Sequence, residues 1–77
     1  MNEYAAQNAQ QWAREEARCL KDIKRLNKAI EQLNGSKDDG VLKIKALMSL
    51  EIARLAEERE QANAKLKYYL ARLYAMD

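Results

Sequence analysis

Proline, histidine and phenylalanine are missing from this 77-residue sequence, and cysteine and glycine are scarce. Without proline, nothing strongly interrupts a helix, and both glycines, Gly35 and Gly40, fall in one short polar segment. Without histidine, the chain lacks the side chain that transfers protons near neutral pH and the commonest nitrogen ligand of zinc. The single cysteine, Cys19, cannot form a disulfide within the chain. These absences favour long helices and argue against an enzyme.

The chain also lacks any run of the roughly 20 uncharged apolar residues that a transmembrane helix requires. With 48% hydrophobic and 34% charged residues, its composition is typical of a folded, water-soluble protein. The first residues do not resemble a secretory signal, so we expect a cytoplasmic protein that contacts no membrane. The net charge of +2 is too small to indicate a nucleic-acid partner by itself.

Two long helical patterns flank the segment that contains the glycines. The first, over about residues 2–34, is rich in good helix formers and has a narrow apolar stripe broken at Glu16. The second, over about residues 40–75, has an apolar stripe interrupted by Arg59 and continued to Met76. The sequence therefore predicts an all-α fold, a coiled-coil-like antiparallel hairpin of two helices that forms a single domain.

The turn is expected at residues 35–39. Gly35 can adopt the left-handed conformation that ends a helix, and Asn34 precedes it as the last residue of the first helix. Ser36 with Asp39 resembles a capping box for the second helix, although Asp39 alone could also be the cap.

The second helix carries more apolar side chains than the first helix can cover. At this length one core supplies only about 3–5 kcal/mol without disulfides, metals or association. We therefore expect hairpins to assemble into a homo-oligomeric four-helix bundle, as a dimer or a tetramer. The predicted oligomer core consists of Trp12, Leu20, Ile23, Leu26, Ile30, Leu33, Val41, Ile44, Met48, Ile52, Leu55, Leu66, Tyr69 and Leu73.

Five large side chains of the second helix lie off its main stripe and form a predicted surface for a partner or for oligomerisation. They are Leu47, Leu50, Tyr68, Leu70 and Tyr74. Tyrosine is a frequent interface anchor because it combines a large apolar area with a polar tip. The sequence leaves open whether these residues close a homo-oligomer or bind a different protein.

No residue is predicted to be catalytic, to bind a cofactor or to hold a metal. Cys19 has basic neighbours that can activate a thiol, but its position on the apolar stripe favours an inert buried side chain. The adjacent glutamates, Glu15 with Glu16 and Glu57 with Glu58, point about 100° apart on a helix and lack a histidine partner.

A basic stripe follows one face of the first helix and consists of Arg14, Arg18, Lys21, Arg25 and Lys28. It is a candidate surface for an anionic partner, including the phosphates of a nucleic acid. The competing interpretation is salt bridging within the hairpin, where Arg14, Arg18 and Lys24 approach Glu60, Glu57 and Glu51.

The size and helical architecture resemble those of small hairpin regulators, such as phage antirepressors or inhibitors, and of the co-chaperones of bacterial secretion systems. The resemblance is one of architecture. From the surplus apolar surface we expect a non-enzymatic regulator or adaptor that self-associates and binds and occludes another protein. One alternative is a co-chaperone in a heterocomplex with an aggregation-prone subunit. The other is a nucleic-acid-binding hairpin that uses the basic stripe.

Overall fold

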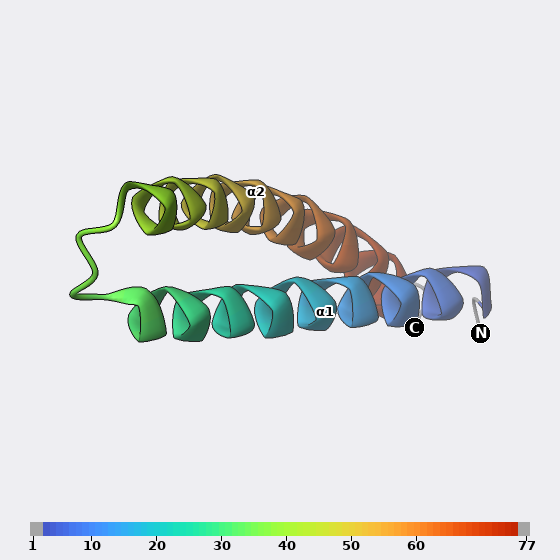
Figure 1. Ribbon diagram of the computed structural model, residues 1–77. Helices are drawn as coiled ribbons and strands as arrows, with labels where there is room; N and C mark the ends of the chain where they lie inside the picture. Colours follow the sequence, from blue (N-terminus) through green and yellow to red (C-terminus); the bar gives the residue numbers. More distant parts are fainter. Residues whose placement is uncertain (1–2, 76–77) are drawn as a thin grey trace.

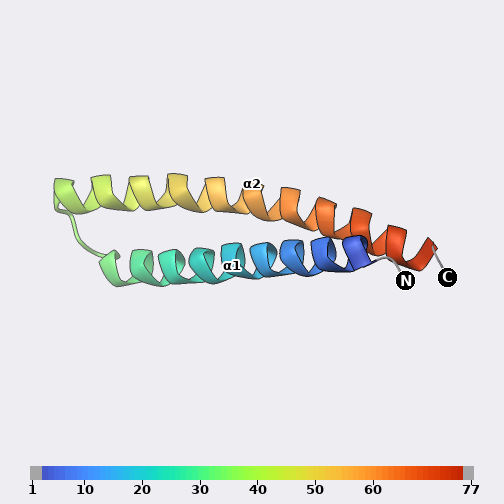
Figure 2. The same cartoon turned by 90° about the vertical axis from the view of Figure 1, so that its right-hand side faces the viewer.

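The protein is a two-helix hairpin in the computed structural model, which describes residues 3–75 (Figure 1). Helix α1 spans Glu3–Leu33 and helix α2 spans Asp39–Ala75. The two helices run antiparallel side by side, and the first and last described residues lie at the same end (Figure 2). The predicted all-helical hairpin is thus confirmed. Asn2, at the expected start of the first helix, and Met76, on the expected stripe, lie outside the described residues.

The first helix ends as the sequence predicts. Gly35 has a φ of 92°, which lies in the left-handed region that glycine adopts without steric cost. The chain tightens just before it, where the backbone N–H of Asn34 donates to the carbonyl of Glu31 at 3.2 Å. After it, the N–H of Ser36 donates to the carbonyl of Leu33 at 3.4 Å. Gly35 therefore redirects the chain out of α1.

The second helix is capped by a residue that the sequence analysis does not select. The carboxylate of Asp38 accepts hydrogen bonds from the N–H groups of Gly40 at 2.7 Å and Val41 at 3.3 Å. Both predicted caps, Ser36 and Asp39, are therefore wrong. Asp39 is already the first helical residue, and the Ser36 hydroxyl instead accepts a bond from the N–H of Asp38 at 3.4 Å. Only Asp38 lies one residue before the helix, where its side chain reaches the free N–H groups of the first turn.

The helices pack along a hairpin seam whose residues recur at steps of four and three, the spacing of a coiled coil. In α1 the seam consists of Ala5, Ala9, Trp12, Glu16, Cys19, Ile23, Leu26, Ile30 and Leu33, and in α2 of Val41, Lys45, Met48, Ile52, Leu55, Glu58, Ala62, Leu66, Tyr69 and Leu73, all of them buried or half-buried. Among the described residues, five are buried: Ala5, Ala9, Cys19, Leu55 and Ala62.

Two positions of α2 differ from the predicted stripe. Ile44 is 47% exposed in the hairpin, and Lys45 is the half-buried residue beside it. Arg59 is exposed, whereas Glu58 turns toward α1. Successive residues point about 100° apart around a helix. A charged residue next to the expected seam position can therefore take its place when it has a partner on the other helix.

The two ends of the hairpin are packed differently. In both views the helices lie closer together near the termini than near the turn (Figures 1 and 2). Three alanines, Ala5, Ala9 and Ala62, allow this close approach, whereas larger side chains such as Ile30 and Met48 fill the seam toward the turn. No residue from 20 to 54 is fully buried. Within residues 3–75, neither helix combines the length and the apolar character needed to cross a membrane.

Candidate protein-interaction surface

Helix α2 presents a second row of small and large apolar side chains on the side away from the hairpin seam. We define the outer face of α2 as Ala46, Leu50, Ala53, Glu57, Glu60, Ala64, Lys67, Ala71 and Tyr74, which again recur at steps of four and three and are all exposed. Leu50 and Tyr74 are 68% and 74% exposed, close to each end of the row. A helix with apolar side chains on two opposite faces needs a partner on each of them.

The other predicted surface residues flank this row. Leu47 and Tyr68 lie along one edge of it, and Leu70 lies along the other. All three are exposed, as are Leu42 and Ile44 nearer the turn. In α1, by contrast, Tyr4 is the one large apolar side chain of the described residues that is exposed. The surplus apolar surface therefore belongs to α2.

The continuity of this face is not predicted from the sequence. Three alanines of the outer face, Ala53, Ala64 and Ala71, lie between Leu50 and Tyr74, and Ala46 precedes Leu50. They are small, and the charges of Glu57, Glu60 and Lys67 interrupt them, so the apolar residues near the turn and near the end read as two separate groups. The sequence feature that could have revealed one continuous face is the unbroken alternation of four- and three-residue steps from residue 46 to residue 74.

Aromatic side chains cluster where the chain ends meet. The rings of Tyr4 and Tyr69 pack edge to face with centroids 6.1 Å apart, and those of Tyr68 and Tyr69 do so at 5.1 Å. Arg72 lies over the Tyr68 ring and donates to its hydroxyl at 3.1 Å. Tyr68 is thereby held on the surface of α2 with its ring accessible, as a preformed anchor requires.

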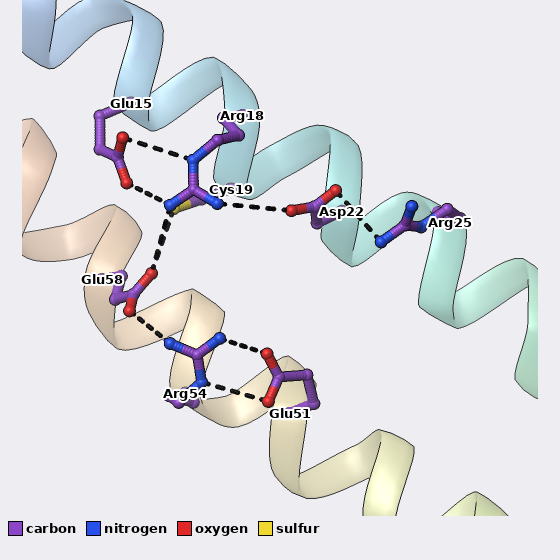
Figure 3. Close-up of polar contacts among 8 residues, drawn as sticks. All are labelled: Glu15, Arg18, Cys19, Asp22, Arg25, Glu51, Arg54 and Glu58. Atoms are coloured by element: carbon purple, nitrogen blue, oxygen red, sulfur yellow. Dashed lines mark hydrogen bonds and ion pairs between the residues drawn. The ribbon is translucent and has the colours of Figure 1, made fainter.

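The middle of the hairpin holds a polar network (Figure 3). The guanidinium of Arg18 binds Glu15 and Asp22 on its own helix and reaches Glu58 of α2 at 3.7 Å. Arg54 binds the other oxygen of Glu58 and also Glu51. Glu58 therefore bridges two arginines from different helices, which explains why this charged residue faces the seam.

A second polar contact crosses the seam nearer the termini. The side-chain amide of Asn63 donates to the Glu16 carboxylate at 2.8 Å, so the glutamate that breaks the apolar stripe of α1 has a partner across it. Trp12 also has a charged neighbour, because the Lys65 ammonium lies 4.2 Å from the centre of its ring.

Cys19 is fully buried in this network, with its Sγ 3.9 Å from a Glu58 oxygen. Burial raises the pKa of the thiol, although the nearby Arg18 charge acts in the opposite direction. A protonated thiol without access to solvent is a poor nucleophile. The arrangement thus suits a packing role for Cys19.

The ligand atoms of Glu15, Cys19 and Glu58 lie within 4.8 Å of one another, a spacing that could hold a metal ion. The Arg18 guanidinium already binds both carboxylates, and its hydrogen bond to Glu15 lowers the pKa of that carboxyl. The positive charge that these acids require is therefore supplied by an arginine. We interpret the group as a salt-bridge network.

The basic stripe is divided between two environments. Arg18 and Arg25 form ion pairs with acids of α1, and Arg18 also reaches α2. Arg14, Lys21 and Lys28 are exposed and form no ion pair within residues 3–75. The expected interhelical pairs are not formed as predicted. Arg18 meets Glu58 rather than Glu57, and among the described residues Arg14 does not pair with Glu60, nor Lys24 with Glu51.

No protein-family model matches the chain, and neither curated proteins nor solved structures gave a match. A functional assignment must therefore rest on the surface chemistry of the hairpin.

Proposed function

We propose that the protein is a non-enzymatic helical regulator or adaptor that self-associates and binds and occludes another protein. The observation that carries this proposal is the outer face of α2 with its flanking residues, where Leu47, Leu50, Tyr68 and Tyr74 are each more than half exposed. Large apolar side chains gathered on one helix face are typical of a groove-binding or bundle-forming helix. Cys19 is buried, and arginines bind Glu15 and Glu58, which favours packing and salt bridging over catalysis or metal binding at these side chains.

The proposal is tested by light scattering on the purified chain at micromolar concentration, where we expect at least a dimer. Tyr74→Ala should weaken assembly or capture of a partner by more than about 1 kcal/mol, because truncation of an interface anchor typically costs this much. Helix content should persist, because the Tyr74 side chain is mostly exposed in the hairpin. A monomeric wild type would contradict the self-association.

A matched control separates apolar from electrostatic binding. The joint change of Arg14, Lys21 and Lys28 to alanine removes three exposed charges of α1 and leaves the outer face of α2 intact. We expect this variant to retain assembly and to retain any host protein captured in an affinity pull-down. Loss of the captured protein from this variant, with Tyr74→Ala neutral, would contradict the assignment to α2.

The same control addresses a second candidate function, nucleic-acid binding through the basic stripe. It is favoured by one observation, that Arg14, Lys21 and Lys28 form no ion pair within residues 3–75. Affinity from such contacts falls steeply with salt because counterions are released from the phosphates. Salt-dependent retention on DNA or RNA, abolished in the triple alanine variant, would support this candidate.

A further inference from the structure

We propose that the outer face of α2 binds a second copy of this chain in an antiparallel, two-fold symmetric pair, with Glu57 of each copy opposite Lys67 of the other. The inference deepens the proposed function, because it rests on the self-association and specifies its geometry. It rests on three features of the described residues: the spacing of the outer face, the order of its side chains, and the exposed charges of that face that have no ion-pair partner within residues 3–75.

The spacing of the outer face is that of a second coiled-coil seam. Side chains that recur at alternating steps of four and three stay on one side of a helix and can interlock with the same pattern on a neighbour. The row from residue 46 to residue 74 keeps this alternation without a break. Most of its apolar members are alanines, which allow two helix backbones to approach closely.

The order of the side chains suits an antiparallel pair of identical helices. With Glu57 opposite Lys67, Leu50 faces Tyr74, Ala53 faces Ala71 and Glu60 faces Ala64. Large side chains then meet at the two ends, alanines meet inside them, and opposite charges flank a centre in which Glu60 faces the small Ala64. An interface between identical chains with two-fold symmetry must be complementary to itself, and this face meets that condition.

Neighbouring registers lack this complementarity. A shift by one heptad in one direction places Glu57 opposite Glu60 of the second copy, so like charges meet. A shift in the other direction places Glu57 opposite Tyr74 and Lys67 opposite Ala64, so both charges lose a charged partner. Because like charges destabilise and opposite charges stabilise a coiled-coil pair, the Glu57–Lys67 register is preferred.

The charges that this register requires are available. Glu57 and Lys67 are exposed and form no ion pair within residues 3–75. The nearby Glu51, Arg54 and Glu58, by contrast, are bound to one another. An exposed acid and an exposed base on one helix face, nearly three turns apart, cannot reach each other within the helix, so a Glu57–Lys67 pair can form only between two molecules.

The test exchanges the two charges between chains. In Glu57→Lys and in Lys67→Glu, each homodimer would hold two like-charge contacts, and we expect its dissociation constant to rise about tenfold. In an equimolar mixture, one variant presents two lysines at these positions and the other presents two glutamates, so both contacts of the mixed pair join opposite charges. The mixture should therefore form a heterodimer with nearly wild-type affinity. Analytical ultracentrifugation measures these affinities, and the double variant Glu57→Lys/Lys67→Glu should also regain dimerisation.

The outcomes separate the register from the self-association itself. Two weakened homodimers with recovery on mixing would support the proposed pair. A wild-type dimer whose affinity is unchanged by either single reversal, or is not recovered on mixing, would overturn this register while self-association stands. A monomeric wild type would instead contradict the proposed function.

Lys28→Glu, a charge reversal on the exposed side of α1, is the matched control and should leave the dimer unchanged. An equal weakening of the dimer by Lys28→Glu would show that net charge alone governs assembly and would overturn the proposal.

Discussion

Alanine occupies three of the five buried positions among residues 3–75: Ala5, Ala9 and Ala62. A buried alanine contributes little apolar area of its own, but it allows the facing helix to come close and to cover the larger side chains beside it. The small residues therefore set the separation of the helices toward the termini, where both views show them nearest (Figures 1 and 2).

Enlarging one of these alanines should open the seam. We expect Ala62→Leu to destabilise the hairpin by about 1–3 kcal/mol, because added methylenes in a packed site force neighbouring side chains and backbones apart. Urea unfolding followed by circular dichroism, at one protein concentration, measures the loss. Ala17→Leu is the matched control, because Ala17 is exposed on α1 and leucine is a good helix former. Equal unfolding midpoints for the two variants would contradict the tight packing at Ala62.

Single charged residues are where prediction from the sequence fails. The seam of α2 follows from the spacing of its apolar residues, and Leu55 and Ala62 are indeed buried. The inward turn of Glu58 could not be predicted, because it depends on Arg18 and Arg54 arriving from two helices at once. The spacing of the apolar residues shows which positions face the seam, but the partner of a charged residue depends on the tertiary geometry.

At the scale of the helices, the position of each end is governed by one side chain or one backbone conformation. Gly35 closes α1 in the way that its lack of a Cβ predicts. At the start of α2 the sequence offers Ser36, Asp38 and Asp39, all of them good caps by residue type. Sequence alone cannot rank them, because a shift of one residue changes which N–H groups a carboxylate reaches.

The cap assignment is directly testable. We expect Asp38→Ala to destabilise the hairpin by about 1 kcal/mol, because two N–H groups of the first turn of α2 lose their acceptor. Asp38→Asn should retain most of the stability, since an asparagine oxygen also caps a helix. Asp39→Ala is the control within the first turn and should change the thermal unfolding midpoint less. A larger loss from Asp39→Ala than from Asp38→Ala would contradict the observed cap.

The two helices differ in how many apolar faces they carry. Helix α1 buries one face against the seam and leaves a mostly charged and amide-rich surface, whereas α2 carries the seam and the outer face. The excess on the second helix and the steps that join it into one row are visible in the sequence, but only the seam shows that this row faces away from α1. The rotation of α2 about its axis is what turns Leu50 and Tyr74 away from α1.

The whole molecule is unevenly packed along its length, which extends over 58 Å. Every buried side chain of the described part of the chain lies at residues 5–19 or 55–62, and none lies between residues 20 and 54. The seam near the turn, with Ile30, Leu33 and Val41, is only half-buried, and Leu42 and Ile44 beside it are exposed. The turn end of the hairpin therefore has the weaker tertiary support.

This asymmetry predicts a gradient of local stability. Amide hydrogens of residues 22–29 and 45–52 should exchange at least about tenfold faster than those of residues 9–19 and 55–66, because opening the turn end exposes little buried surface. Hydrogen exchange read by mass spectrometry of peptides resolves these segments, and the comparison avoids the fraying ends of both helices. The proposed antiparallel pair is centred near Ala62, so it should steepen the gradient as protein concentration rises. Equal protection of the turn end, appearing as protein concentration rises, would mean that another copy covers the exposed leucines there, and would place the self-association on that end instead of the outer face of α2.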